Sequence, residues 1–244
     1  MQSSKKVPKL FLPKPIASLL LELLIVGFGV YLGFMANTYT QSQNEKSYIN
    51  ATIKEMYQSL AEDIIDAEDN KEGHYRGLKA VSYFAKLIKN KPINQDSFLI
   101  YLQVLTRNFV SVQNSSAFET IRSRGFNVIE DDSLRRQMVK LYDFKYETLE
   151  KIEEKYQESQ IYSNESNHIN TILSNSLVFD ENLKLQKIIL PLNITNQDRN
   201  RLILILQRIS TTRNFNIMVY EDAINHMKLV RKQIATQYPF VLKQ

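Results

Sequence analysis

The most constraining feature of the sequence is an apolar run from Ile16 to Ala36, which follows a short segment containing four lysines. The run is about 21 residues long, whereas the apolar core of a cleavable signal peptide has only about 7 to 15. Phe34 and Ala36 also make a poor small-x-small cleavage site. A helix of this length reaches across the roughly 30 Å hydrocarbon core of a bilayer. The sequence therefore predicts an uncleaved transmembrane signal anchor at residues 16–37.

Charge is distributed unevenly along the chain. The lysines at positions 5, 6, 9 and 14 account for most of the formal net charge of +5, so the remainder is nearly neutral. Because positive charge marks the cytoplasmic flank of a membrane span, we expect residues 1–15 to be a short cytoplasmic tail. Residues 38–244 are then an extracytoplasmic domain. No basic stripe lies on that domain, which argues against a nucleic-acid partner.

Glu22 is the one acidic residue inside the apolar run. The 14 residues from Leu23 to Ala36 make only about 21 Å of helix, so a full span must include Glu22. It lies about 9 Å along the helix from Ile16, in the cytoplasmic half of the membrane. A carboxylate near the bilayer centre costs on the order of 3 kcal/mol, and less near the edge. Glu22 is therefore a candidate intramembrane functional residue, although its cost is tolerable without a function.

Four further residues fall on the same helix face as this carboxylate. Glu22, Val26, Gly29, Gly33 and Ala36 follow one another at spacings of four, three, four and three residues. Small residues four apart let transmembrane helices approach closely, although the pattern is common. We therefore expect a helix-packing face that contacts another membrane protein or a second copy of the chain.

The stretch ELLIVGFGVYLGFMANTYTQ resembles the N-terminal signature of a bacterial family of uncharacterised single-pass membrane proteins. In that signature an acidic residue, a glycine, a small residue and an asparagine are spaced as Glu22, Gly29, Gly33 and Asn37 are here. Tyr39 stands where the family usually has Trp, and alanine is commoner at the position of Gly33. The stretch SSAFETIRSRGFNVIEDDSLRRQMVKLY is similar to a second stretch of the family. The resemblance implies a bacterial inner-membrane protein with a helical periplasmic domain, and it implies no activity.

The rest of the sequence has the composition of a helical domain. Glycine and proline number only six each, while strong helix formers are abundant. Apolar residues recur every three or four positions in several segments, which indicates amphipathic helices. We predict an all-α fold, in which an N-terminal transmembrane helix precedes an elongated antiparallel helical bundle without a sheet. The expected bundle helices are residues 48–70, 74–88, 98–105, 116–124, 132–173 and 195–238.

Turn and capping residues predict where these helices begin and end. Gly73 and Gly77 are expected to interrupt or bend the chain. Residues 174–193 have no clean period and are expected to form an irregular connector. The other expected features are a polar linker at 38–46 (unless helix continues through it), a capping box from Ser116 to Glu119, a left-handed Gly125, N-caps at Asp131 or Asp132 and at Thr195, and a stop at Pro239.

Few residues of the sequence match a pattern typical of a catalytic or metal-binding site. His74, His168 and His226 are far apart in the sequence and are expected at the surface or in local hydrogen bonds. Glu165-x-x-His168 is half of a di-iron carboxylate motif, but no second half occurs. The charged residues 151–158 are typical of a solvated helix face. Cysteine is absent, and so are nucleophile-elbow, phosphate-loop and zincin motifs. We therefore predict no catalytic, cofactor-binding or metal-binding residues.

These patterns favour a membrane-anchored helical interaction protein that is not an enzyme and acts as a scaffold, accessory subunit or sensing module. A cytoplasmic tail of about 15 residues leaves no room for a signalling domain, so any signal must pass through a partner. The alternative is an ion-coupled energiser-type subunit that uses Glu22. Biopolymer-transport and flagellar-stator proteins share this plan, but they typically carry Asp, and their outer domains contain strands.

Overall fold

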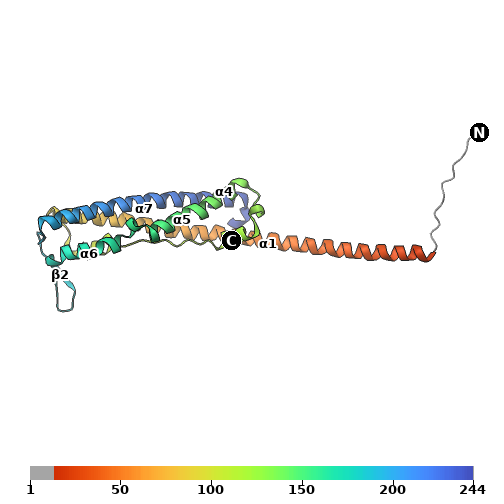
Figure 1. The fold of residues 1–244 in the computed structure, drawn as a ribbon, viewed down its shortest axis with the longest axis horizontal. Helices are drawn as coiled ribbons and strands as arrows, with labels where there is room; N and C mark the ends of the chain where they lie inside the picture. Colours follow the sequence, from red (N-terminus) through yellow and green to blue (C-terminus); the bar gives the residue numbers. More distant parts are fainter. Residues whose placement is uncertain (1–13, 244) are drawn as a thin grey trace, which may run out of the picture. The chain divides into compact units, whose positions relative to one another are not determined.

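The computed structural model describes the backbone of residues 14–243 and the side chains of residues 18–243. The chain divides into two compact units, residues 1–51 and 52–244. The predicted all-α class is confirmed, because helices make up most of both described units (Figure 1). The helices are α1 (Lys14–Ile88), α2 (Phe98–Thr106), α3 (Ser116–Arg124), α4 (Asp132–Lys140), α5 (Glu147–Glu150), α6 (Ile161–Leu173) and α7 (Asn196–Gln237).

Helix α1 is continuous. Of the two possibilities left open for residues 38–46, a polar linker or continued helix, the structure shows helix. The helix also continues without a break through Gly73 and Gly77, where an interruption or a bend was expected. The helix ends before Lys89, as the sequence predicts. Asn90 has a positive φ of 53°, and its N–H donates to the Leu87 carbonyl while that of Lys91 donates to Lys86. This is a Schellman cap with Asn in the left-handed position.

The expected helix at 132–173 is divided into several pieces. Two π-helical turns, η3 (Leu141–Tyr146) and η4 (Lys151–Lys155), flank α5, and the chain leaves the helix at Tyr156. A 3₁₀ turn, η5 (Gln157–Ser159), then leads into α6. The Gln157 carbonyl accepts from the Gln160 N–H of this turn at 3.2 Å and also from the Asn164 side chain at 2.7 Å, rather than from the i+4 N–H of a continued α-helix. The prediction of one unbroken helix is therefore wrong.

The prediction that the chain contains no sheet is wrong at residues 174–193. Strand β1 (Leu177–Phe179) pairs antiparallel with β2 (Leu185–Ile188), and Leu177 lies opposite Ile188. Asp180 organises the turn, because its Oδ1 accepts hydrogen bonds from the N–H groups of Asn182 and Lys184. Figure 1 shows this hairpin at one end of the bundle.

The short helix α3 differs in detail from the expected capping. Ser115 is its N-cap, and the N–H of Ser116 is bound by Asn114 Oδ1 at 3.0 Å, so the expected capping box does not form. Gly125 does follow the helix with a positive φ of 87°. Its ψ of 137° lies outside the left-handed helical region. Asp131 caps α4 by accepting from the Leu134 N–H at 2.6 Å.

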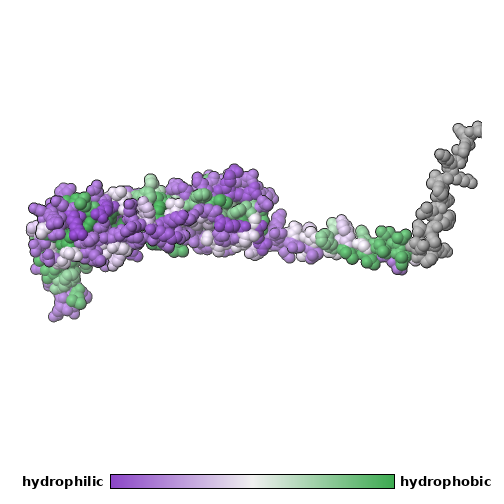
Figure 2. Space-filling view, viewed as in Figure 1, coloured by the Kyte–Doolittle hydropathy of each residue, from purple (hydrophilic) through white to green (hydrophobic). Residues whose placement is uncertain are grey.

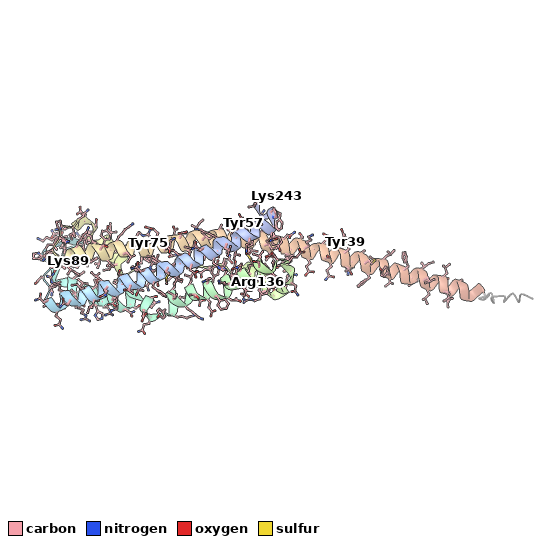
Figure 3. The ribbon with its side chains drawn as sticks, turned by 90° about the horizontal axis from the view of Figure 1, so that it is seen from above. Tyr39, Tyr57, Tyr75, Lys89, Arg136 and Lys243 are labelled. Atoms are coloured by element: carbon pink, nitrogen blue, oxygen red, sulfur yellow. The ribbon has the colours of Figure 1, made fainter. Side chains whose placement is uncertain are left out.

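Helix α7 packs antiparallel on the part of α1 that belongs to the second unit (Figures 1 and 3). Its predicted N-cap is confirmed, because Thr195 Oγ1 accepts from the Asp198 N–H at 3.0 Å. Pro239 begins a 3₁₀ turn, η7 (Pro239–Leu242), directly after the helix. Hydrogen bonds between the two helices join Arg231 to the Tyr57 carbonyl, Tyr75 to Glu221 and Arg199 to the Ile88 carbonyl.

The core of the second unit is apolar towards its ends, and between them it also contains buried polar side chains. The end nearest the hairpin packs residues of α1, α2, α6 and α7 around Phe84, Phe98 and Leu202. Towards the other end, buried apolar residues of α3 and α4 include Phe118 and Leu134. The buried polar side chains of the middle come from α1, η4, α7 and the segment that joins α2 to α3.

Candidate functional site

The face predicted for helix packing lies on the first part of α1. Glu22, Val26, Gly29, Gly33 and Ala36 are all exposed. A Cβ built on Gly29 or on Gly33 meets nothing within 4 Å. The small residues therefore leave an open surface that another helix can approach closely.

The apolar residues around this face are exposed as well. Within α1 an 18-residue window has a mean hydropathy of 2.2, and none of the window is buried. Figure 2 shows this stretch as hydrophobic. By length and composition it is able to cross a membrane, and a membrane anchor or a signal sequence has these properties. A contiguous apolar surface of this size is rarely left exposed to water in a soluble protein.

A second, unexpected site occupies the middle of the bundle. Residues 107–115, here called the strap, join α2 to α3 without secondary structure of their own. Three carboxylates accept hydrogen bonds from strap N–H groups that a helix would have satisfied internally. These bonds run from Ser111 to Glu153 (3.2 Å), from Val112 to Asp66 (2.8 Å) and from Asn114 to Asp63 (3.0 Å).

Hydroxyl groups complete the coordination of the two buried carboxylates. Tyr146 donates to Asp63 Oδ2 at 2.5 Å, and Tyr220 donates to Glu153. Ser111 Oγ also donates to Glu153 Oε1 at 2.9 Å. Burial raises the pKa of Asp63 and of Glu153 above their ordinary values, although these donors oppose the shift. Burial also raises the pKa of both tyrosines, so they stay protonated and keep donating.

Arg213 of α7 is completely buried, and its hydrogen bonds run to backbone carbonyls and to a histidine ring rather than to a carboxylate. Its Nη2 donates to the carbonyls of Val104, Leu105 and Arg107 at 2.9, 2.8 and 3.1 Å. These carbonyls lie at the C-terminal end of α2, where the helix dipole is negative. Burial lowers the pKa of Arg213 to about 10, so the guanidinium is still charged at neutral pH. Arg213 therefore caps α2 and fixes the start of the strap.

His74 lies beside this guanidinium, so of the two expected environments, the surface or a hydrogen bond within the fold, it has the second. It is buried, and its Nδ1 accepts from Arg213 Nη1 at 3.3 Å. The ring packs against Phe109 of the strap and Tyr220 of α7. Burial, together with the charge of Arg213, lowers the pKa of His74 to about 3. The imidazole is therefore neutral at physiological pH, with its proton on Nε2.

The two glycines that were expected to bend α1 instead make room for these groups. A Cβ at Gly77 would lie closer than 3.0 Å to the Arg213 side chain, and a Cβ at Gly73 would overlap the Phe109 ring. Real Cβ atoms essentially never approach neighbours so closely. Glycines four apart on one helix face thus form the recess that receives Arg213 and the strap.

The other histidines do not join this cluster. His168 is exposed, and its Nδ1 lies 2.8 Å from Arg201 Nη2. Glu165 is buried, and its Oε1 accepts from Arg208 Nη1 at 2.9 Å. The two residues of the half motif thus contact different arginines. His226 is buried on α7 and donates from Nε2 to the Gln137 carbonyl at 3.1 Å. Among residues 14–243, no group of three or more His, Asp or Glu side chains is arranged to hold a metal ion.

The buried polar cluster in the middle of the bundle, here called the middle layer, holds the strap in place and has a structural role. Asp63 and Glu153 are occupied by strap N–H groups and hydroxyls, and His74 is held neutral between aromatic rings. These contacts tie α1, η3, η4 and α7 to the strap. Comparisons of the chain with protein-family models, with curated proteins and with solved structures found no match.

Proposed function

We propose that the chain is a bacterial membrane-anchored interaction protein without enzymatic activity of its own, acting as a scaffold, an accessory subunit or a sensing module. The observation that carries this proposal is the fully exposed apolar stretch of α1 with its open small-residue face. A bilayer is the environment that removes such a surface from water. The resemblance of the same stretch to a family of single-pass proteins agrees with this proposal.

The bundle supports a binding role rather than a catalytic one. The buried carboxylates of Asp63 and Glu153 are engaged in holding the strap, and burial keeps His74 neutral. In the proposed arrangement the N-terminus is cytoplasmic, and residues 38–244 lie in the periplasm. The partner is another membrane protein or a second copy of the chain, which packs on Gly29 and Gly33.

The absence of cysteine makes the orientation easy to test. Single-cysteine variants Ser3→Cys and Ser163→Cys are exposed to a membrane-impermeant maleimide in spheroplasts. We expect labelling of Ser163→Cys alone, and labelling of both variants only after lysis. Labelling of Ser3→Cys in intact spheroplasts, or recovery of the chain in the soluble fraction, contradicts the proposal.

The packing face is tested by crosslinking in native membranes. Gly29→Ile with Gly33→Ile is expected to abolish the crosslinked complex, because the larger side chains hold the helices apart. Val30→Leu is a control, since Val30 lies next to Gly29 but outside the predicted face. A native chain that is recovered only as a monomer would count heavily against an interaction role. An ion-coupled energiser-type subunit that uses Glu22 stays the alternative.

A further inference from the structure

An apolar groove with a cationic rim lies on the surface of α4 and η3. It has a volume of about 470 Å³ and is lined by Phe126, Arg135, Arg136, Val139, Lys140 and Phe144. Phe144 is 63% exposed, although its neighbours Tyr142 and Tyr146 in the same π-helical turn are buried. A π-helical turn is rare and frequently marks a functional site. Here it carries a large aromatic side chain on the outside of the bundle.

The charges around the groove are of one sign. Arg136 and Lys140 are four residues apart on α4, and neither forms an ion pair within the described part of the chain. Like charges at this spacing destabilise a helix by a few tenths of a kcal/mol. The nearest acids in the sequence are already engaged, because Asp132 pairs with Arg135 and Asp143 pairs with Arg122. Of the three basic residues that line the groove, Arg135 is therefore paired, while Arg136 and Lys140 have no anionic partner among the described residues.

We propose that this groove binds an acidic protein segment that inserts one or two aromatic or aliphatic side chains beside Phe126, Val139 and Phe144. The apolar floor suits an inserted anchor, and Arg136 and Lys140 suit carboxylates on either side of it. An apolar side chain flanked by carboxylates matches both the apolar lining and the basic residues beside it, whereas a lipid headgroup supplies an anion without an apolar group next to it. For this reason a protein segment fits better than anionic lipid. The inference rests on the proposed interaction function and names the chemistry of the partner.

The test is a selection of random 12-residue displayed peptides on the full chain in detergent micelles. We expect the selected peptides to combine Asp or Glu with an aromatic or aliphatic residue. Fluorescence anisotropy of the best peptide should show at least tenfold weaker binding to Arg136→Glu and to Phe144→Ser. Binding should also weaken as salt rises, because the rim charges are exposed.

The matched control is Lys89→Glu, which makes the same charge change at an exposed position. Lys89 lies at the other end of the bundle from Arg136 (Figure 3), and its substitution should leave binding unchanged. Arg136→Gln, which removes the charge without reversing it, should show an intermediate loss. All these side chains are exposed, so the unfolding transition of each variant should match that of the unmodified chain.

Three results would overturn the proposal. The first is a set of selected peptides that is consistently neutral or basic, and the second is undiminished peptide binding by Arg136→Glu and Phe144→Ser. The third is binding of vesicles of phosphatidylglycerol and phosphatidylcholine, but of no acidic peptide, to the groove of the chain in nanodiscs. Each result leaves the membrane anchor untouched, because maleimide labelling and crosslinking report on α1 independently.

Discussion

Gly77→Ala is expected to destabilise the bundle, although the same change stabilises an ordinary helix. Alanine is favoured over glycine inside a helix by about 1 kcal/mol. At position 77, however, the added Cβ would overlap Nε, Cζ and Cδ of Arg213. The guanidinium would have to move until these contacts reach at least 3.4 Å. Arg213 cannot make that shift and keep its three carbonyl acceptors at about 3 Å.

The magnitude follows from the bonds that are lost. A hydrogen bond to a charged group contributes about 1.5 to 3 kcal/mol. Losing one of the Arg213 bonds and gaining the helix propensity of alanine lowers the free energy of unfolding by about 0.5 to 2 kcal/mol. Losing two lowers it by about 2 to 5 kcal/mol. Urea unfolding of the full chain in detergent micelles, followed by circular dichroism, measures the difference.

Gly29→Ala is the control in the same helix, because a Cβ there meets nothing within 4 Å. It should leave the unfolding of the bundle unchanged. Arg213→Lys should be destabilising too, since an ammonium cannot reach the same carbonyls in the same geometry. A Gly77→Ala variant that is as stable as, or more stable than, the unmodified chain would refute the placement of Arg213 against α1.

Three further predictions concern single residues. Because the folded-state pKa of His74 is depressed to about 3, the stability it contributes is fully present above pH 6.5. It is lost as the pH falls from 6.5 towards about 3, by on the order of 1 kcal/mol per pH unit. His74→Gln should therefore flatten the pH dependence of the free energy of unfolding, and an equal slope in the variant would contradict this. Leu183 is 85% exposed and has a φ of 62°, a backbone conformation that is unfavourable for any residue with a Cβ. Leu183→Gly should therefore raise the free energy of unfolding by up to about 1 kcal/mol in the same assay, whereas Leu183→Ala should give no gain. Glu22→Gln should leave the crosslinked complex intact if Glu22 only packs, and full function of this variant would remove the ion-coupling alternative.

Helical periodicity predicted the fold class because most of the chain consists of long amphipathic segments. Helix α7 was expected over 195–238 and covers Asn196–Gln237, since its apolar positions, its N-cap and the stop at Pro239 all agree. The continuity of α1 was harder to predict, because a glycine weakens a helix in isolation. Only the packing of Arg213 and Phe109 explains why Gly73 and Gly77 occur there.

The middle layer left a weaker signal in the sequence. Arg213 lies four residues from both Ile209 and Ile217, which are buried, so a charge on the apolar face of α7 was visible. Its partners were not, because backbone carbonyls have no sequence signature. Residues 151–158 were expected to be solvated, yet Glu153 is buried by the strap. The hairpin was missed because its strands are too short for an alternating pattern to stand out.

The strap also has a consequence for how the chain folds. Helical bundles usually fold fast because most of their contacts are local. Here the bonds that hold the strap join residues far apart in the sequence, 51 positions for Asn114 and Asp63 and 108 for Arg213 and Leu105. Each of these bonds can form only after the long stretch of chain between its two residues has folded back as a closed loop. The helices can therefore form early, while the bonds of Arg213 have to wait for α7, which follows all the other α-helices of residues 14–243 in the sequence.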